Sequence, residues 1–223
     1  MIEPPFHLYL DSADLEAIGA VLPHALIYGV TTNPTLMRRA GLKRSALQPF
    51  VKQVLDWGAR AVHVQVEASD AEGMLRDVQA LLTWAPPGAV IPKISATRAG
   101  FAAGARLSAQ GVPVTYTAVF EPEQVLFAVN TGAVYAAPYL GRLDDRNGHG
   151  LAAVARMQAV VERYGQRTRL LVASVRSREA FLGLLDLGVG AVTVPPSLLP
   201  SLLDHAATLE AERVFIADAE AAG

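Results

Sequence analysis

Eight short apolar segments recur along the chain, and a longer stretch with helical periodicity follows each of them. The apolar segments are rich in Val, Ile, Leu, Tyr and Thr, which favour strands. Several are apolar throughout, which is typical of strands buried on both faces of a parallel sheet. We expect these strands at residues 7–11, 27–33, 61–66, 89–94, 112–119, 133–140, 169–174 and 190–195.

The segments between the strands carry apolar residues at the three- and four-residue spacing of a helix. One of them opens with Ser69 and has Glu72 three residues later, which is a capping-box pattern. We expect helices at 14–22, 42–57, 69–84, 97–110, 121–130, 150–164, 177–187 and 197–205, and a further helix at 206–222.

Strict alternation of strand and helix predicts a parallel α/β sheet. Eight such units in 223 residues fit the small end of the (β/α)₈ TIM barrel. We therefore expect a single-domain barrel over residues 1–205, with residues 206–223 as a C-terminal helix or tail available to pack on a neighbouring subunit. The competing fold is an open doubly wound sheet, but the residues after the first strand, 11–14, lack its glycine-rich fingerprint.

Composition excludes several classes of protein. The net charge of −2 provides no basic surface for nucleic acid. The absence of cysteine excludes disulfides, cysteine-ligated metals and a thiol nucleophile. No apolar run approaches the ~18 residues of a membrane-spanning helix, and residues 1–6 lack the pattern of a signal peptide. We therefore expect a cytoplasmic protein with neither a nucleic-acid nor a membrane partner.

Polar side chains stand near the carboxyl ends of the predicted strands, where the active sites of such barrels lie. Their gathering at one mouth would make a polar pocket. They are Asp11, Thr31, Asn33, Gln65, Lys93, Thr115, Thr117, Tyr139, Arg142, Ser174 and Arg176.

Lys93 is the most informative of these residues. A lysine inside an apolar strand is costly in its charged form, and a neutral amine attacks carbonyls to form Schiff bases. By alternation Lys93 shares a face with Ile91, so that Pro92 would point toward the helices. The alternative is that the strand ends at Pro92 and Lys93 is a solvated loop residue.

The other candidates have equally plain alternatives. Asp11 would serve as a helix cap, and Asn33 before a proline is ordinary turn chemistry. Arg142 and Arg176 would be surface charges. Gln65 has the weaker alternative, because an amide inside a strand needs several hydrogen-bond partners.

The ordered motifs of the chain resemble those of the transaldolase family, especially its small members, which include the fructose-6-phosphate aldolases. The resemblance covers nearly the whole chain, with one motif for each of the first seven strands. The motifs are LYLD at 8–11, GVTTNP at 29–34, VQV at 64–66, Lys93, TAVF at 117–120, APYLGRLDD at 137–145 and AS at 173–174.

This resemblance implies a (β/α)₈ barrel that carries out class I aldol chemistry on sugar phosphates, without a cofactor or metal ion. It implies a place in carbohydrate metabolism, in the pentose phosphate pathway, and a homo-oligomer, a pentamer or decamer. Lys93 would form the Schiff base, and Asp11 would contact the substrate hydroxyls and relay protons. The water-positioning group would be Gln65, Thr117 and Tyr139, with Tyr139 as the general acid/base.

The resemblance also implies the binding residues. Thr31 and Asn33 would hold the dihydroxyacetone unit. Arg142, Ser174 and Arg176 would hold the phosphate, for which an arginine fork is suited by its paired hydrogen bonds.

Two departures from the family pattern matter. Pro92 precedes Lys93, whereas the family's proline follows the lysine; a proline inside a strand suggests a bulge that would alter the aim of Lys93. Position 65 is Gln, where many transaldolases have Glu, and an amide cannot take a proton from water. Gln65 favours the aldolase branch and the GRLDD motif at 141–145 favours the transaldolase branch; we expect the aldolase reaction.

Two other functions stay open from the sequence. A sugar-phosphate isomerase would use Asp11 and Tyr139 while Lys93 acts only electrostatically. A non-catalytic sugar-phosphate binder would have kept the mouth of the barrel and lost the chemistry.

Overall fold

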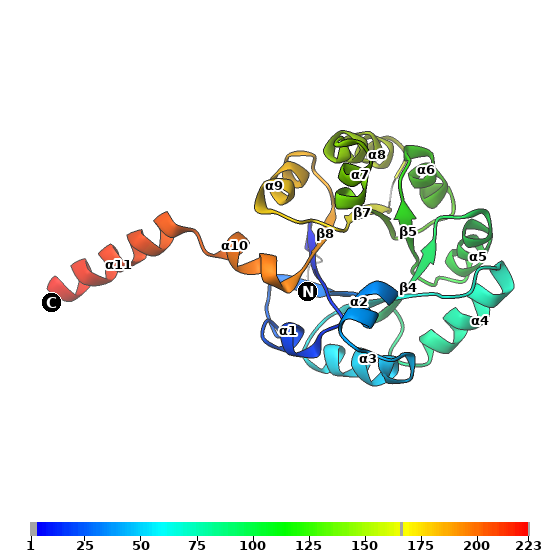
Figure 1. Ribbon diagram of the computed structural model, residues 1–223, viewed down its shortest axis with the longest axis horizontal. Coiled ribbons are helices and arrows are strands. Elements are labelled where there is room, and N and C mark those ends of the chain that lie inside the picture. The colour runs from blue at the N-terminus through cyan, green and yellow to red at the C-terminus, as the bar shows by residue number, and fades with distance from the viewer. Residues whose placement is uncertain (1–3, 166, 223) are drawn as a thin grey trace.

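Eight parallel strands close into a barrel in the computed structural model, which describes residues 4–165 and 167–222 (Figure 1). Each strand pairs with the next in sequence, and β1 pairs with β8. The barrel confirms the predicted (β/α)₈ fold and excludes the open sheet. The strands are β1 His7–Asp11, β2 Ile27–Thr31, β3 Ala61–Gln65, β4 Val90–Ser95, β5 Thr115–Val119, β6 Tyr135–Pro138, β7 Arg169–Val172 and β8 Ala191–Val194.

An outer ring of helices surrounds the barrel (Figure 1). The predicted helices are present, with ends displaced by a few residues. They are α1 Leu15–Gly19, α3 Leu47–Asp56, α4 Ala71–Leu82, α5 Arg98–Ala109, α6 Pro122–Asn130, α8 Gly150–Tyr164, α9 Arg178–Asp186 and α10 Leu199–Leu203.

Two further helices were not predicted from the sequence, and both border the mouth of the barrel. They are α2, Pro34–Arg39, and α7, Leu140–Asn147. The predicted turn at Asn33 is in fact a helix start, with Asn33 as the cap and Pro34 in the first turn. In Figure 1, α2 lies in front of the ring of strands. Short 3₁₀ turns at Arg44–Ala46 and Pro196–Leu198 complete the connections.

Aromatic side chains fill the inside of the barrel toward the amino-terminal ends of the strands. Tyr135 bonds His7 Nδ1 at 2.6 Å and the Tyr9 hydroxyl at 2.9 Å. His63 packs its ring edge-on against Tyr9, with ring centres 4.7 Å apart. Burial raises the pKa of Tyr9 well above its usual value and lowers that of His63. This aromatic layer fills the interior of the barrel, and the cavity described below opens at the carboxyl ends of the strands.

Strand β4 runs without a bulge at Pro92, so the expected irregularity there is wrong. Its register is continuous against β3 and against β5. The Lys93 carbonyl accepts from the backbone N–H of Val66, directly after β3, so the backbone of Pro92 faces β5. Pairing with β5 begins only at Lys93 and Thr115. Pro92 has no N–H, but it precedes the first residue of β4 that pairs with β5. The proline therefore removes no hydrogen bond between these two strands.

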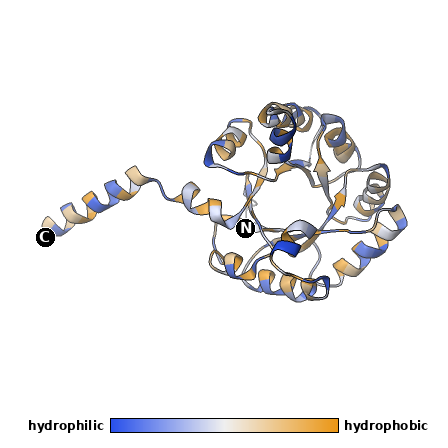
Figure 2. Ribbon diagram, in the orientation of Figure 1, coloured by the Kyte–Doolittle hydropathy of each residue, from blue (hydrophilic) through white to orange (hydrophobic). Residues whose placement is uncertain are grey.

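The last helix, α11, Ala206–Ala221, extends away from the barrel (Figure 1). None of its residues is buried, and Phe215 is 70% exposed. Apolar residues recur along this helix (Figure 2). No helix in the ranges that the structure describes is long and apolar enough to cross a membrane.

Candidate active site

A cavity of about 340 Å³ opens at the carboxyl ends of the strands. It is lined from β1 and β4, from α2 and α7, and from the loops after β7 and β8. Most of the residues proposed from the sequence line it, namely Asp11, Asn33, Lys93, Tyr139, Arg142, Ser174 and Arg176.

Lys93 reaches this cavity from the inner face of β4. Its side chain is 2% exposed, and its Nζ donates to the Thr32 carbonyl at 3.2 Å. Ile91, on the same face, packs in the barrel interior, as strand alternation predicts. The alternative of a solvated loop lysine is therefore wrong. The buried amine therefore lies at the cavity, where it can meet the carbonyl group of a ligand.

Asp11 faces Lys93 from β1 and does not cap a helix. Asp14 provides the cap of α1, accepting from Glu16 N at 2.9 Å. Asp11 Oδ1 instead accepts from the Thr31 hydroxyl at 2.8 Å. Burial raises the pKa of Asp11, and Lys93, the Thr31 hydrogen bond and Arg142 oppose that shift in this order. A carboxyl group with a raised pKa that lines a cavity beside an amine is a candidate for proton transfer.

Thr31 lies beneath the cavity and belongs to its support. It is fully buried, and its hydroxyl also shares a hydrogen bond of 2.7 Å with Thr193. The hydrogen bond from Thr31 to Asp11 holds the Oδ1 atom of the Asp11 carboxylate in place. The structure therefore places Thr31 against Asp11 and below the lining of the cavity.

Tyr139 stands across the cavity, and Thr117 holds its hydroxyl. The two oxygens share a hydrogen bond of 2.5 Å. The guanidinium of Arg142 lies 4.6 Å from the centre of the Tyr139 ring. Ala118, directly after Thr117, has φ 55° at a register shift between β5 and β6. Such strained, bulged positions at strand ends re-aim neighbouring side chains, here that of Thr117.

Asn33 combines a structural and a site role. Its Oδ1 accepts from Leu36 N at 3.0 Å and caps α2. The cap uses the amide oxygen, which leaves the amide N–H groups for the cavity. The hydrogen bond that caps α2 therefore also orients the Asn33 amide toward the cavity.

Ser174 and the two predicted phosphate-site arginines form the rim. Ser174 has φ 61°, and its carbonyl accepts from Gly141 N at 3.1 Å, which joins the loop after β7 to α7. Arg176 is bonded to both carboxylate oxygens of Asp145, at 2.6 and 2.7 Å. That pairing lowers the pKa of Asp145 and raises that of Arg176. Arg176 thus reaches the rim with much of its hydrogen-bonding capacity already engaged.

Gln65 lies outside this cavity. It pairs with Lys93 in the β3–β4 register, but it lines an adjoining hollow of about 340 Å³ with Pro34, Ser95 and Thr97. The predicted site residues therefore divide into a cavity group, two buried supports, Thr31 and Thr117, and this outlier.

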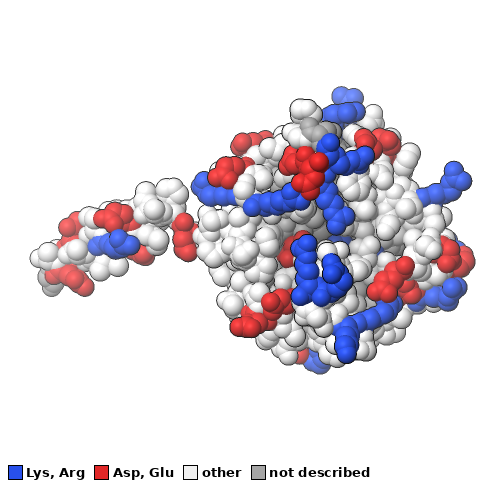
Figure 3. All heavy atoms as spheres, in the orientation of Figure 1, with Lys and Arg blue, Asp and Glu red and all other residues white. Residues whose placement is uncertain are grey.

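Arg39 is a lining residue that sequence reasoning missed, together with its neighbour Leu36. Both come from α2, which was not predicted as a helix. The signal was the Asn-Pro start at 33–34, which directs the next turn of helix over the mouth. In Figure 3, basic side chains border the hollow at the mouth on opposite sides.

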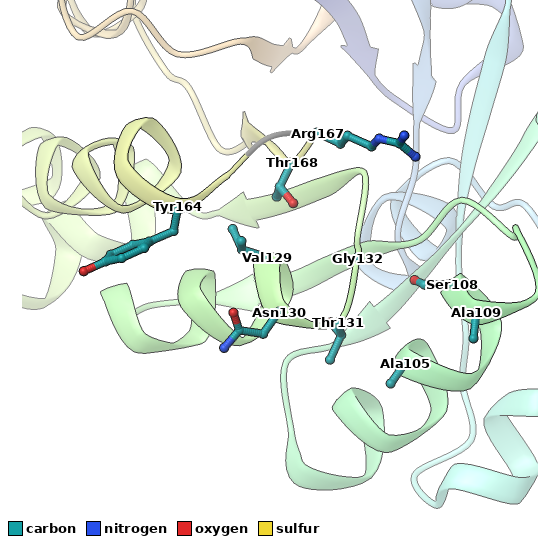
Figure 4. A pocket seen from close by; sticks show the side chains of 10 residues that line it. All are labelled: Ala105, Ser108, Ala109, Val129, Asn130, Thr131, Gly132, Tyr164, Arg167 and Thr168. Carbon is teal, nitrogen blue, oxygen red and sulfur yellow. The ribbon is translucent and has the colours of Figure 1, made fainter.

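A larger hollow than the Lys93 cavity lies at the other end of the barrel. It measures about 670 Å³ and is bordered by the carboxyl-terminal ends of α5, α6 and α8, with Ser108, Asn130 and Tyr164 among its side chains (Figure 4). Its described lining residues include no buried amine or carboxylate. The smaller cavity around Lys93 is therefore the candidate active site.

Comparison with known proteins identifies the family of the chain. Residues 8–222 match the model of the family described as Transaldolase/Fructose-6-phosphate aldolase. A protein from Coprothermobacter proteolyticus named a probable transaldolase is 34% identical over 210 residues, which is 94% of each chain. A protein of the same name from Aquifex aeolicus is 34% identical over 203 residues, 90% of each chain.

Two solved structures share the fold at low identity. The CutC protein of Streptococcus agalactiae superposes with a TM-score of 0.62 and 14% identity, covering 84% of this chain and 97% of its own. A protein from Coccidioides immitis assigned as a fructose-1,6-biphosphate aldolase gives 0.57 and 18%, covering 85% and 73%. At these identities the likeness concerns the barrel alone.

Proposed function

The chain belongs to the transaldolase and fructose-6-phosphate aldolase family, and from this premise we propose that Lys93 forms a Schiff base with a ketose phosphate. The observation that carries the proposal is the placement of Lys93, buried on the inner face of β4 and open to a cavity that Asp11 and Tyr139 also line. A desolvated amine flanked by two proton-transferring groups is the arrangement that carbonyl attack requires.

The reaction begins when the Lys93 amine adds to the C2 carbonyl of the ketose phosphate. Loss of water then gives an iminium, which withdraws electrons from the bond between C3 and C4. As that bond breaks, the C4 hydroxyl loses its proton and an aldehyde phosphate leaves. A dihydroxyacetone unit stays on Lys93 as an enamine.

Two groups have the geometry to move protons in these steps. Tyr139, tied to Thr117, donates or accepts a proton on one side of the cavity. Asp11, whose pKa burial raises, does so on the other side. Asn33 and the Asp11–Thr31 pair hold the hydroxyls of the dihydroxyacetone unit, and the rim formed by Arg142, Ser174 and Arg176 receives the phosphate.

The enamine has two possible fates, and we propose transfer to a second aldose phosphate. The sequence argument for hydrolytic cleavage was Gln65, but this side chain lines the adjoining hollow. Relatives that align over nearly the full chain are named probable transaldolases. Both observations support a transaldolase-type reaction.

Borohydride trapping tests the Schiff base. Incubation with fructose 6-phosphate and borohydride should add the mass of a reduced dihydroxyacetone or hexose phosphate unit to Lys93, located by peptide mass spectrometry. The Lys93→Met chain should gain no mass. Turnover without any adduct would indicate an isomerase-type reaction, and binding without turnover or adduct would indicate a non-catalytic binder.

An acceptor experiment tests transfer. Release of glyceraldehyde 3-phosphate from fructose 6-phosphate is measured with and without erythrose 4-phosphate. Transfer predicts release that depends on the acceptor. Release at a similar rate without the acceptor would show that the enzyme is an aldolase and would contradict the proposal.

We also propose that the chain forms a homo-oligomer through residues 206–223. The helix α11 has no buried residue, and Leu209, Phe215 and Ile216 are exposed on it. Exposed apolar stretches of this kind are typical of interaction surfaces. A second copy of the barrel is the partner that this arm would bury them against.

A further inference from the structure

Two residues other than glycine have a left-handed backbone in the ranges that the structure describes, Ala118 with φ 55° and Ser174 with φ 61°. Ala118 lies near the end of β5, and Ser174 follows β7. These two strands flank β6, which leads directly into Tyr139. A side chain with a Cβ atom disfavours the left-handed region, and such strained positions concentrate at functional sites. Both strained residues therefore border the strand that carries a group of the proposed mechanism.

Ala118 is the extra residue of a β-bulge. Thr117 and Val119 pair with consecutive residues of β6, so Ala118 between them has no partner on that strand. Strict alternation would turn Val119 to the same face as Thr117. Instead Thr117 reaches Tyr139 at the mouth of the barrel, whereas Val119 is fully buried in the core that the strands share with the helices. The bulge thus separates a side chain of the site from a side chain of the core.

Hydrogen bonds hold the backbone on both sides of the bulge. The Thr117 carbonyl accepts from Ala96 N at 2.9 Å. On the other side, Gln124 Oε1 accepts from Phe120 N at 2.8 Å. The amide nitrogen of Gln124 donates to the Ala96 carbonyl at 3.0 Å and joins these two anchors. Because a strained conformation persists only where its surroundings over-determine it, this closed set of bonds accounts for the left-handed backbone of Ala118.

The residues around the bulge confine Tyr139. Thr117 shares the hydrogen bond of 2.5 Å with the Tyr139 hydroxyl, and the Phe120 ring meets the Tyr139 ring edge-on, with centres 6.1 Å apart. From the other side, the Ser174 carbonyl accepts from Gly141 N at 3.1 Å and holds the first turn of α7. Tyr139 is therefore held between the two left-handed residues.

We infer that Ala118 is a positioning residue for Tyr139, because its left-handed backbone forms the bulge that aims Thr117 at the Tyr139 hydroxyl. The inference rests on the proposed function, in which Tyr139 transfers protons, and it adds a residue that does not line the cavity. A misplacement of about 1 Å is enough to slow a reaction about 100-fold. A residue that cannot hold this backbone should therefore lower kcat more than it affects substrate binding.

Two substitutions of similar size separate the backbone conformation from the bulk of the side chain. Asn tolerates the left-handed region, whereas the β-branched side chain of Val strongly disfavours it. Ala118→Val should lower kcat for transfer from fructose 6-phosphate to erythrose 4-phosphate about 10- to 100-fold and leave the KM values nearly unchanged. Ala118→Asn should keep kcat near that of the unaltered chain. Equal losses of kcat in the two variants would overturn the inference.

The same substitution in the Tyr139→Phe chain tests whether its effect passes through Tyr139. Positioning predicts that Ala118→Val has little further effect on kcat in that chain, because no hydroxyl is left for Thr117 to hold. A merely structural role predicts the same fold loss of kcat with and without the Tyr139 hydroxyl, and that result would overturn the inference.

Two further measurements do not depend on turnover. Crystal structures should show the hydrogen bond between Thr117 and Tyr139 kept in Ala118→Asn and broken in Ala118→Val, and a bond kept in both would contradict the inference. Ala118→Gly should raise the Tm, because glycine adopts the left-handed region without strain. A lower Tm would contradict the inference even if the Ala118→Val chain did not fold. Absence of turnover in the unaltered chain would refute the proposed function, and the crystal structures would still decide the role of Ala118.

Discussion

Burial and hydrogen bonding shift the pKa of the Asp11 carboxyl group in opposite directions. Burial raises its pKa, while Lys93, the Thr31 hydroxyl and Arg142 favour the ionised form. Because the net shift is upward, the folded protein binds the Asp11 proton more tightly than the unfolded chain. The stability that this provides is present below the unfolded pKa and is lost as the pH rises through the folded pKa.

We therefore predict that Asp11→Asn raises the Tm at pH 7–8 and that this gain shrinks toward pH 4. Asn keeps an acceptor for the Thr31 hydroxyl and removes the buried charge. Activity should fall by about 100-fold or more, because an amide cannot exchange the proton. Thermal unfolding across this pH range checks the prediction, and a change in Tm that is the same at both ends would contradict it.

Tyr139 allows a test in which activity and stability separate. Tyr139→Phe removes the hydroxyl bonded to Thr117, and we predict a fall in kcat of about 10²–10⁴-fold with a loss of about 1 kcal/mol in the free energy of unfolding. The control is Tyr116→Phe on β5, the strand of Thr117; the Tyr116 hydroxyl accepts from the Thr131 hydroxyl at 3.0 Å on the helix side. In the control, denaturant unfolding should show a similar loss of stability, whereas steady-state kinetics should show an unchanged kcat. Similar kcat values in the two variants would contradict the role of Tyr139.

The helix α2 carries two of the site's side chains, so its position matters for binding as well as for the fold. It has only six residues, Pro34–Arg39, and its start depends on the Asn33 cap. A helix this short has little intrinsic stability, so loss of the cap would destabilise the whole helix. The mouth of the barrel thus depends on a hydrogen bond made by a site residue.

We predict that Asn33→Ala lowers stability by about 1 kcal/mol, the usual effect of a lost cap, and also raises the KM for fructose 6-phosphate. The matched control is Asp70→Ala, which removes the cap of α4, where Asp70 accepts from Gly73 N at 2.8 Å. Denaturant unfolding should give similar losses for the two variants. Kinetics should show a raised KM only for Asn33→Ala, and an equal KM in both would place Asn33 outside the site.

The whole molecule consists of a closed barrel and an extended arm. The barrel core is complete without α11, because none of the residues of that helix is buried. An arm with exposed Phe215 and Ile216 gains stability only when something covers it. We therefore expect the arm to contribute to the association of subunits more than to the folding of one chain.

We predict that Phe215→Glu shifts the protein toward monomers while the barrel stays folded. A buried carboxylate at an apolar interface would be strongly unfavourable. Sedimentation velocity measures the oligomeric state, and far-UV circular dichroism checks the fold. Arg213→Ala, which removes the exposed partner of Glu210, is the control and should leave the assembly unchanged. An unchanged sedimentation coefficient for Phe215→Glu would contradict the proposed role of the arm.

Local patterns in the sequence were enough to predict the barrel. Several strands, such as β6, are apolar on both faces, and the helices between the strands carry regular apolar spacing, so a closed parallel sheet was the consistent solution. The same alternation put Lys93 and Ile91 on one face of their strand, and the structure shows that this face is the inner one. The cavity residues Asp11 and Tyr139 followed from the ends of their strands and from the family motifs.

Only the tertiary structure decided how these groups share their hydrogen bonds. The pairing of Arg176 with Asp145, the tie between Thr117 and Tyr139 and the entry of Arg39 from α2 all join residues from different elements. Pro92 is tolerated because its missing N–H falls before the β5 ladder, and Gln65 turns to the adjoining hollow. Sequence periodicity fixes which face a side chain occupies, whereas its partners depend on the register and closure of the barrel, which no single segment encodes.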